Sequence, residues 1–319
     1  MLKRALAVVA FCLPLLCLAQ SYPNRPIKIV PNSAPGTAPD LLARLIGARF
    51  TESLGQPVVV ENRAGGAGNV AAEFVARSPA DGYTLMIGPD VIFTVNPHVY
   101  AKLGFDSNRD LVPVASIVSQ EFVLCVNPSV PAKTLAEFID YARRANPPLY
   151  YASAGNGSTH HLSMEMLKAR AGINLVHVPY KGGGAAAMVA LIAGDVAAMI
   201  GGTSVLAQVK AGKLRAIAST APVRSAHHPE LPVFAETLPS YEVVTWIAMF
   251  APAGTPADVL AKLRTTLNGF LALPETRQRF AAAGGMAPFI SKPEEFAAVI
   301  RRDFEKYGQL VREIGVRAE

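Results

Sequence analysis

Residues 58–87 read VVVENRAGGAGNVAAEFVARSPADGYTLMI, and this stretch decides the fold class. It begins with a β-branched run at 58–60 and passes through a glycine-rich loop into a helical pattern over 70–75. After a Pro-Ala-Asp-Gly turn it ends on the apolar run 83–87. Strand, loop, helix and strand in this order are typical of a parallel sheet that helices cover on both faces. We therefore expect an α/β fold.

The same alternation extends outward from this stretch. Before it, a strand is expected at 27–30, followed by a helix that starts at Asp40 and ends at Gly55. Further strands are expected at 121–126, 149–152, 175–178, 196–200, 214–219 and 243–250, with helices between them. A long amphipathic helix is expected from residue 291 onward.

Two of the later helices have recognisable start signals. Thr134 and Glu137 form a capping box, in which each side chain satisfies a backbone amide at the helix start. Residues 255–258 predict another helix start, with Pro256 as the first helical residue. Both signals support helices between the strands of the second half.

Because both halves of the chain alternate in this way, we expect two lobes. The predicted boundaries are 20–124 plus 246–319 for lobe 1 and 125–245 for lobe 2, with chain crossings in the apolar strands near 121–126 and 243–250. A cleft between such lobes brings strand carboxyl ends and helix N-termini face to face. Backbone amides and the helix dipole favour an anion there, by about 0.3–1 kcal/mol per helix.

The first 19 residues predict export. Lys3 and Arg4 precede an apolar run at 5–18, and Ala19 is a small residue at the expected cleavage point, as in a secretory signal peptide. The apolar run is shorter than the roughly 20 residues of a membrane helix. Lipidation at Cys17 is an alternative that the bulky Leu16 disfavours. We expect a periplasmic protein, which argues against enzymes that need free nicotinamides, ATP or CoA.

Composition narrows the function further. Loss of the leader leaves 28 basic against 24 acidic residues, a formal charge of +4. The basic residues are scattered, which disfavours binding to nucleic acid. Cys12 and Cys17 leave with the leader, so Cys125 is alone and no intrachain disulfide is expected. Apolar neighbours predict that Cys125 is buried.

The sequence from Gly66 to Ala71 matches the dinucleotide fingerprint G-x-G-x-x-A, with Asp90 about twenty residues further on. A Rossmann-like, nicotinamide-dependent oxidoreductase that uses Gly66, Gly68 and Asp90 is therefore one alternative. However, residues 61–65 separate the motif from the strand, whereas the fingerprint loop leaves its strand at once. We prefer a glycine loop that lets the backbone approach a ligand in the cleft.

Hydroxyls and imidazoles lie together at 153–161, which suggests a hydrolase or a metal site. No G-x-S-x-G elbow supports hydrolysis, and Ser158 or Thr159 is better explained as a helix N-cap. A zinc site formed by His160, His161 and His177 is disfavoured because adjacent histidines point apart on a helix. We expect neither catalysis nor a metal here.

Tyr180 and Lys181 follow a predicted strand and precede three glycines that open a helix. The glycines are not a phosphate-binding P-loop, because the required Gly-Lys-Ser/Thr order is missing. Ligand contact by this pair is one interpretation. The alternative is that Tyr180 packs in the fold while Lys181 is a solvated charge.

Several stretches of the chain together resemble a known family. They are YPNRPIKIV (22–30), APGTAPDLLARL (34–45), residues 55–88, NPHVY (96–100), YASAGNGSTHHLSMEMLK (151–168), HVPYKGGGAA (177–186), AGKLRAIAST (211–220), VFAET (233–237), APAGTP (251–256) and SKPEEFAAVIRRDFEKYGQLV (291–311). They resemble the extracytoplasmic receptors of the tripartite tricarboxylate transporter family, also called the Bug or TctC family.

The resemblance implies a two-lobed, type II-like periplasmic binding protein (a Venus flytrap), in which each lobe is a mainly parallel sheet flanked by helices. It implies that a monomer closes on a small carboxylate and delivers it to the membrane permease of a tripartite tricarboxylate transporter. Neither a cofactor nor catalysis is implied. A ligand-sensing subunit for a membrane kinase would have the same fold and stays a further alternative.

The family's motifs also carry ligand-binding positions over to this chain. The carboxylate is held there largely by backbone amides and ordered waters from the first two cleft loops, which match residues 33–38 and 64–69. The implied ligand-binding residues are Ser33, Ala34, Gly36, Thr37, Ala38, Gly65, Gly66, Ala67, Gly68, Asp90, Ser153, Ser158, Thr159, His160, Tyr180, Lys181, Gly201 and Thr203.

Three departures from the family pattern bear on the ligand. This chain has Asn32-Ser33 where Pro-Phe is usual, Thr37 in place of a second glycine, and Gly201-Gly202 where an aspartate is common. An aromatic lid and an anion for an ammonium group are both missing. We therefore expect a di- or tricarboxylate or an aromatic acid rather than an amino acid.

Overall fold

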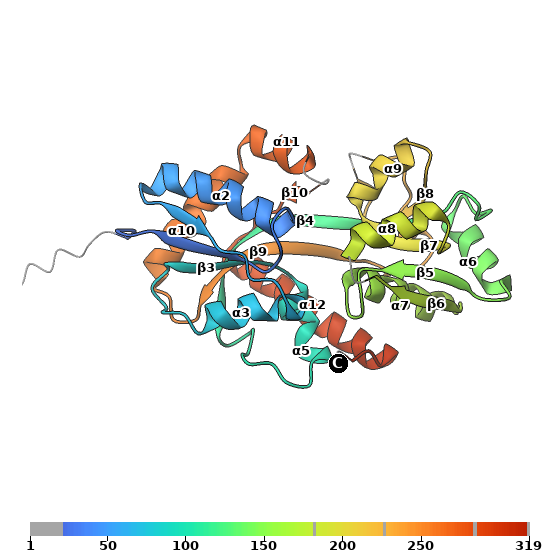
Figure 1. Ribbon diagram of the computed structural model, residues 1–319, viewed down its shortest axis with the longest axis horizontal. Helices are drawn as coiled ribbons and strands as arrows, with labels where there is room; N and C mark the ends of the chain where they lie inside the picture. Colours follow the sequence, from blue (N-terminus) through green and yellow to red (C-terminus); the bar gives the residue numbers. More distant parts are fainter. Residues whose placement is uncertain (1–21, 181–182, 226–227, 283–285, 318–319) are drawn as a thin grey trace, which may run out of the picture.

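The computed structural model of this 319-residue chain describes residues 22–180, 183–225, 228–282 and 286–317. The predicted leader and Lys181 lie outside these ranges. Within them the chain is an α/β structure of two lobes, joined by two long strands that run from one lobe into the other (Figure 1). No helix in the described part combines the length and apolar character needed to cross a bilayer.

One mixed sheet runs through both lobes. Its strands are β1 (Ile27–Pro31), β2 (Val58–Val60), β3 (Thr84–Pro89), β4 (Leu111–Val126), β5 (Leu149–Ser153), β6 (Leu175–Pro179), β7 (Ala198–Gly202), β8 (Arg215–Ser219), β9 (Val244–Pro252) and β10 (Ala287–Pro288). Their order among the described residues is β2-β1-β3-β9-β4-β7-β5-β6, and β8 and β10 each pair with β4. β1 is parallel to β2 and β3, and β5 is parallel to β6 and β7. Each lobe thus has the parallel strands that the alternation predicted.

The strands β4 and β9 connect the lobes. β4 pairs with β9 from Leu111 to Glu121 and with β7 and β8 from Phe122 onward. The change of partner therefore lies shortly before the boundary predicted at Leu124. In the following text, lobe 1 contains β1 to β3 and lobe 2 contains β5 to β8.

Helices cover both faces of the sheet. They are α2 (Ala38–Leu54), α3 (Asn69–Ala76), α4 (Val91–Thr94), α5 (Asn96–Val99), α6 (Leu135–Arg144), α7 (Thr159–Ala171), α8 (Gly183–Ala193), α9 (Leu206–Lys210), α10 (Ala257–Leu271), α11 (Pro274–Ala282) and α12 (Pro293–Ile314), with short 3₁₀ turns η1 (Gly66–Gly68), η2 (Thr203–Val205) and η3 (Phe234–Glu236). In lobe 1, α2 and α10 pack on one face, and α3 and α12 on the other.

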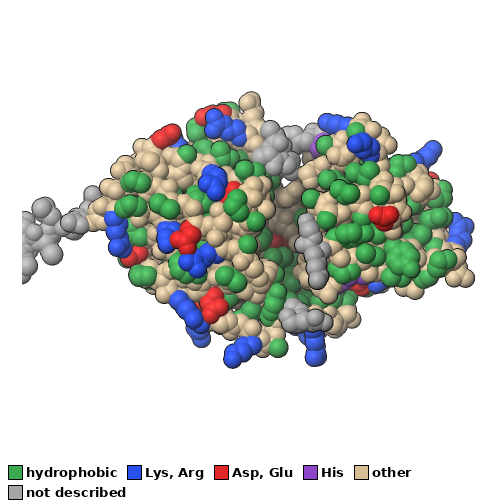
Figure 2. Space-filling model, viewed as in Figure 1, with side chains coloured by type: hydrophobic (Ala, Val, Ile, Leu, Met, Phe, Trp, Pro, Cys, Tyr) green, Lys and Arg blue, Asp and Glu red, His purple; other side chains and the backbone are tan. Residues whose placement is uncertain are grey.

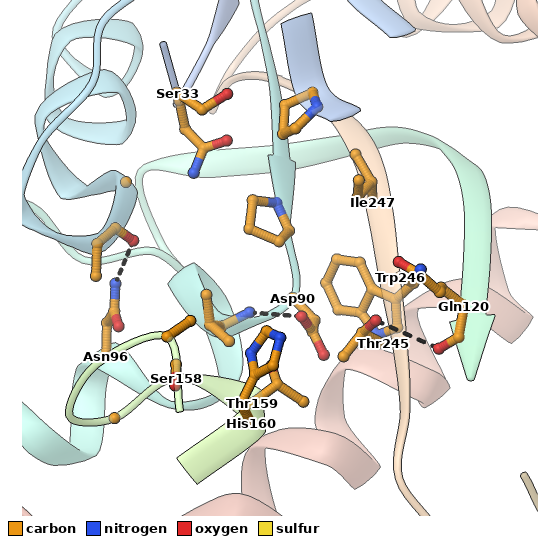
Figure 3. Close-up of a pocket in the computed structure, with 18 of the residues that line it drawn as sticks. Ser33, Asp90, Asn96, Gln120, Ser158, Thr159, His160, Thr245, Trp246 and Ile247 are labelled. Carbon is orange, nitrogen blue, oxygen red and sulfur yellow. Dashed lines mark hydrogen bonds between the residues drawn. The ribbon is translucent and has the colours of Figure 1, made fainter. Parts of the chain in front are cut away.

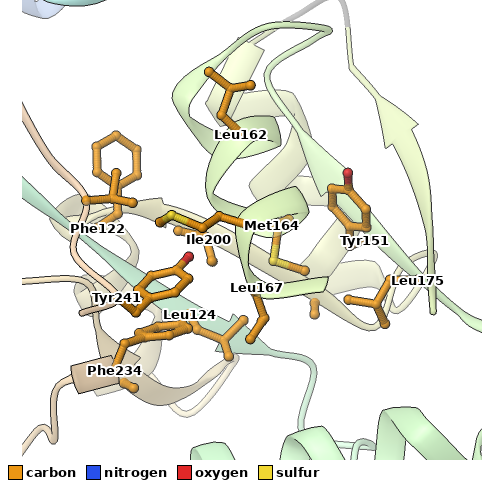
Figure 4. Packing of buried hydrophobic residues seen from close by; sticks show 14 of the residues in the cluster. Phe122, Leu124, Tyr151, Leu162, Met164, Leu167, Leu175, Ile200, Phe234 and Tyr241 are labelled. Carbon is orange, nitrogen blue, oxygen red and sulfur yellow. The ribbon is translucent and has the colours of Figure 1, made fainter. Parts of the chain in front are cut away.

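Lobe 2 has its own apolar core. Leu162, Met164 and Leu167 of α7 pack with Leu124 of β4 and Ile200 of β7 (Figure 4). α8 covers the opposite face, where Cys125 is buried. Each such side chain contributes about 1.5–3 kcal/mol when it is removed from water, so each lobe has a substantial core.

The helix α12 contacts both lobes. Phe296 and Ile300 near its start lie in a lobe 1 cluster with Trp246. Tyr307 and Leu310, further along, pack in the lobe 2 cluster. The helix therefore bridges the two lobes beside the crossing strands.

The local start and stop signals can be compared with the structure directly. Gly55 ends α2 with a φ of +72°, and Thr134 accepts a hydrogen bond from the Glu137 amide at 3.2 Å, both as predicted. The prediction for Pro256 is off by one residue. It is the N-cap of α10 rather than its first helical residue, since its ψ of 140° is not helical. The Thr255 hydroxyl before it donates to the Pro252 carbonyl at 2.7 Å.

Candidate functional site

A cavity of about 590 Å³ lies between the lobes, where the space-filling surface is hollowed (Figure 2). Both lobes and both crossing strands contribute to its wall (Figure 3). Its lining residues are Asn32, Ser33, Pro39, Gly65, Ala67, Gly68, Pro89, Asp90, Val91, Asn96, Val99, Tyr100, Val118, Gln120, Phe122, Ala154, Asn156, Gly157, Ser158, Thr159, His160, Thr245, Trp246 and Ile247. The volume lies in the range typical of small-molecule sites.

The polar groups of this wall are mostly uncharged. They comprise side-chain amides, hydroxyls, one carboxyl group and one imidazole, and none of the described lining residues is Lys or Arg. An anionic ligand would therefore be held by neutral hydrogen-bond donors and by helix N-termini rather than by a cationic side chain.

In lobe 1, the start of α2 is already occupied by a carboxylate of the protein. Asp40, 2% exposed, accepts hydrogen bonds from the Gly36 amide at 2.8 Å, from Arg44 Nε at 3.1 Å and from Asn62 Nδ2 at 3.0 Å. Burial alone would raise the pKa of Asp40, but these hydrogen bonds outweigh it and hold the pKa below its ordinary value. The positive end of α2 is thus neutralised internally.

Only one of the predicted ligand-binding residues of this first loop lines the cavity. Ser33 lines the cavity, whereas Ala34, Gly36, Thr37 and Ala38 do not. The Thr37 hydroxyl donates to the Ala34 carbonyl at 2.8 Å and makes no cap to the helix.

The glycine loop forms the next part of the lobe 1 wall. Gly65, Ala67 and Gly68 line the cavity, and Gly66 does not. Gly68 has a φ of +95°, and a Cβ there would lie 2.6 Å from Asn32 Nδ2, so only glycine fits. Asn96 on α5 holds the loop by donating to the Ala67 carbonyl at 3.2 Å.

Asp90 stands at the end of β3, on the cavity wall, and is 1% exposed. Its Oδ1 accepts from the Val91 amide at 2.9 Å, while Oδ2 is buried with no hydrogen-bond partner in the described chain. Burial, reinforced by the neighbouring Asp303, raises the pKa of Asp90 well above its ordinary value. The Asp90 carboxyl group therefore keeps its proton to a higher pH than an ordinary aspartate, which weakens its repulsion of an anion.

In lobe 2, the cavity wall is the start of α7. Ser158 is the N-cap, as the sequence suggested, and its hydroxyl accepts from the His161 amide at 3.3 Å. Thr159 and His160 are the first two helical residues, so their amides have no carbonyl partner within the helix. Burial lowers the pKa of His160 to about 4, and its ring packs edge-on against Phe122. The His160 side chain is thus a neutral hydrogen-bonding group.

The remaining predicted residues of lobe 2 that the structure describes do not border the cavity. Ser153 is fully buried behind the loop, and Tyr180, Gly201 and Thr203 lie outside the lining set. Lys181 lies outside the described residues. At Gly201 a Cβ would lie 2.8 Å from Val205, which explains a glycine there by packing.

Several lining residues were missed by sequence reasoning. Gln120 on β4, and Thr245 and Trp246 on β9, lie where the two strands cross between lobes, and Asn96 and Tyr100 come from the NPHVY segment. The sequence signal that could have identified the strand residues is the presence of polar residues inside or next to the apolar runs 121–126 and 243–250. These polar residues lie where each strand passes from the core of one lobe to the core of the other.

Comparison with known proteins gives concordant matches. The family model described as "Tripartite tricarboxylate transporter family receptor" matches residues 42–316. Protein BugT of Bordetella pertussis is 33% identical over 302 residues, which cover 94% of this chain and 92% of that protein. Two of the similar solved structures contain a bound carboxylate. The first is R. palustris Rpa4515 with adipate, which is 34% identical with a TM-score of 0.83 over 93% of this chain and 99% of that one. The second is MatC from Rhodopseudomonas palustris with bound malate, which is 29% identical with a TM-score of 0.77 over 91% of this chain and 100% of that one.

Proposed function

This chain belongs to the tripartite tricarboxylate transporter family receptors, and we propose that it captures a small carboxylate in the cavity between its lobes. As a member of this family it is an extracytoplasmic solute-binding protein. The proposed ligands are di- or tricarboxylates or aromatic acids, which it would hand to the membrane permease of a tripartite tricarboxylate transporter.

The observation that carries this proposal is the chemistry of the cavity wall. The wall offers neutral donors from both lobes, has no described Lys or Arg, and raises the pKa of its one carboxyl group, which favours the protonated form. A ligand that bridges the lobes would favour the closed state through contacts that neither lobe makes alone. The adipate and malate bound by two similar proteins are ligands of this class.

We propose two groups of contacts for the ligand. From lobe 1, Ser33 and the loop Gly65–Gly68 face the cavity, and from lobe 2 the first turn of α7 faces it. The other predicted residues that the structure describes would reach a ligand only after the lobes close; they are Ala34, Gly36, Thr37, Ala38, Gly66, Ser153, Tyr180, Gly201 and Thr203. Lys181, outside the described residues, stays a proposed contact.

Thermal unfolding with a panel of acids tests the ligand class. Adipate, malate, citrate and benzoate are the candidates, and aspartate and glutamate are the controls for an ammonium-bearing ligand. A ligand present at a hundred times its Kd should stabilise the folded chain by about 2.7 kcal/mol. Stabilisation by aspartate or glutamate, with no response to the other acids, would contradict the proposal.

We further propose that the protein does not convert its ligand. The alternative, a nicotinamide-dependent oxidoreductase, requires the Asp90 carboxylate to accept hydrogen bonds from a ribose. A buried Asp90 with a raised pKa is poorly suited to that task. NAD added to the same unfolding assay is the control, and stabilisation by NAD would favour the enzyme.

Export, cleavage near Ala19 and a monomeric state belong to the same proposal. N-terminal sequencing of the secreted chain and its mass in solution test them. Transport rather than sensing predicts that deletion of the coding sequence abolishes uptake of the identified acid. Undiminished uptake combined with a lost transcriptional response would favour a sensor.

A further inference from the structure

Two stacked histidines stand directly behind the cavity loop of lobe 2. This loop, residues 154–160, contributes six of the lining residues. His161 on α7 and His177 on β6 stack with ring centroids 4.1 Å apart and an interplanar angle of 14°. Neither histidine lines the cavity, so the proposed ligand contacts leave them without a role.

Each histidine holds a different point of the loop. The Gly157 amide donates to His161 Nδ1 at 3.2 Å. His177 Nε2 lies 2.6 Å from the hydroxyl oxygen of Ser153, which accepts in turn from the Gly155 amide at 3.0 Å. Through these bonds the two rings fix Gly155 and Gly157, between which Asn156 reaches the cavity.

The bond from Gly157 sets a condition on His161. A backbone amide can only donate, so Nδ1 must carry a lone pair and the imidazole must be neutral. A proton on Nδ1 would make Nδ1 a hydrogen-bond donor facing the N–H of Gly157, so this hydrogen bond would be lost. The stacked geometry also disfavours charge on both rings at once.

The surrounding charged groups act on the pair in opposite directions, since Glu165 raises the pKa of both histidines and Lys168 lowers it. The titratable groups that face the pair are Tyr151 of β5 and Glu165 and Lys168 of α7. Glu165 already accepts from the Tyr151 hydroxyl at 2.6 Å and pairs with Lys168 at 2.7 Å. Burial lowers the pKa of His161 below its ordinary value. Burial and the neighbouring His161 lower the pKa of His177 to about 4.

We infer that His161, as a neutral hydrogen-bond acceptor stacked on His177, is a positioning residue that holds the cavity loop 154–160, and that protonation of His161 releases this loop. The inference rests on the proposed function only in taking the loop as part of the ligand site. It predicts that ligand affinity is constant above the His161 transition and falls as the pH drops through it.

Two substitutions distinguish the role of His161 as a hydrogen-bond acceptor from its role as a stacked ring. His161→Asn places its side-chain oxygen where Nδ1 now lies and does not titrate, whereas His161→Phe keeps a ring to stack on His177 but accepts no hydrogen bond. At pH 7, His161→Phe should weaken adipate binding about tenfold, and His161→Asn should stay within about threefold of the unchanged protein. Equal binding by His161→Phe and the unchanged protein would overturn the inference.

A measurement without ligand keeps the test independent of the proposed function. In protein labelled with ¹⁵N-glycine, the Gly157 amide resonance should shift with the His161 imidazole between pH 7.5 and 4, and should stay fixed in His161→Asn. A Gly157 resonance that ignores the His161 titration, or that moves equally in His161→Asn, would overturn the inference, since His160 would then explain the change. If no acid binds the unchanged protein, the proposed function fails while this titration still decides the role of His161.

Discussion

In lobe 1, α2 begins beside the cavity with its own carboxylate, Asp40, bonded to the Gly36 amide. In lobe 2, α7 begins with the Ser158 cap, and its first two residues, Thr159 and His160, line the cavity. The two helix starts differ in charge, because α2 carries the buried carboxylate of Asp40 in its first turn, whereas the first turn of α7 has no acidic residue. A helix N-terminus at a cleft is therefore a ligand site only when the protein has not already occupied it.

The two walls also differ in how tightly they are packed. On the lobe 1 side, a Cβ at Gly68 would meet Asn32 and Ile92 at 2.6–2.7 Å, whereas at Gly155 and Gly157 of lobe 2 no atom lies within 4 Å. At Gly68 the lobe 1 wall thus has no room for an added methyl group unless these side chains shift. Lobe 2 presents a loop with free space around it, held from behind by His161 and His177.

The largest effect is expected at Asp90, the second buried carboxyl of lobe 1. Because burial raises the pKa of Asp90 in the folded chain, the free energy of unfolding should fall as pH rises from about 4 towards the folded-state pKa. Asp90→Asn removes this cost, so its gain over the unchanged protein should grow by up to about 1.4 kcal/mol per pH unit until that pKa is reached.

Urea unfolding from pH 4 to pH 8 measures this gain. The exposed Asp140→Asn serves as the control and should show a difference that does not grow with pH. A pH-independent difference for Asp90→Asn would mean that Asp90 is ionised in the folded chain, and the wall would then carry a negative charge.

The contribution of Asp40 to stability should depend on pH in the opposite direction to that of Asp90. Asp40→Ala removes a buried carboxylate with three hydrogen-bond donors and should lower the free energy of unfolding by about 3 kcal/mol at pH 7. Because its pKa is lowered, the stabilisation is present above the unfolded-state value near 4 and is lost as pH falls through the folded-state value. Urea unfolding at pH 7 and pH 3 tests both statements, and a loss unchanged at pH 3 would contradict an ionised Asp40.

A matched pair of glycine substitutions tests the difference in packing. Gly68→Ala combines a positive φ with a clash against Asn32, whereas Gly157→Ala has a positive φ of +74° and open space. Gly68→Ala should therefore cost about 2 kcal/mol more than Gly157→Ala. Thermal unfolding of both variants measures this, and equal costs would show that the lobe 1 wall yields as easily as the lobe 2 loop.

The alternation of strands and helices was sufficient to predict the two parallel cores, because each strand and helix shows its own periodicity in the sequence. It could not predict α4 and α5, which are four residues each and too short to show a period. Gln120 and Trp246 were missed for another reason. Their place at the cavity depends on how β4 and β9 cross between two cores, which no local pattern encodes.

The environment of Asp40 could not be predicted from the sequence for a different reason. Its position in the first turn of α2 was plain in the sequence, and acidic residues there favour the helix N-terminus. Nonetheless, the carried-over motif assigned the amides of residues 33–38 to a ligand. The motif gives the position of the loop, but only the hydrogen bond from Gly36 shows that the donor is already used.

The smallest effect on stability, and the most direct test of the lobe 2 wall, is expected from Ser158→Ala. Loss of the N-cap should cost about 1 kcal/mol of unfolding free energy, because the His161 amide loses its acceptor. The same change removes the hydroxyl that donates to the Gly155 carbonyl at 2.6 Å and leaves that carbonyl only the longer hydrogen bonds from the Ser158 amide and the Ser153 hydroxyl, both 3.2 Å. The loop should therefore loosen, and adipate binding should weaken more than stability does. Ser33→Ala, on the lobe 1 wall, is the counterpart and should change binding less, since the fixed backbone around it remains. If calorimetry shows the reverse order, the lobe 1 loop rather than the start of α7 holds the carboxylate, and the occupied N-terminus of α2 must open when the ligand binds.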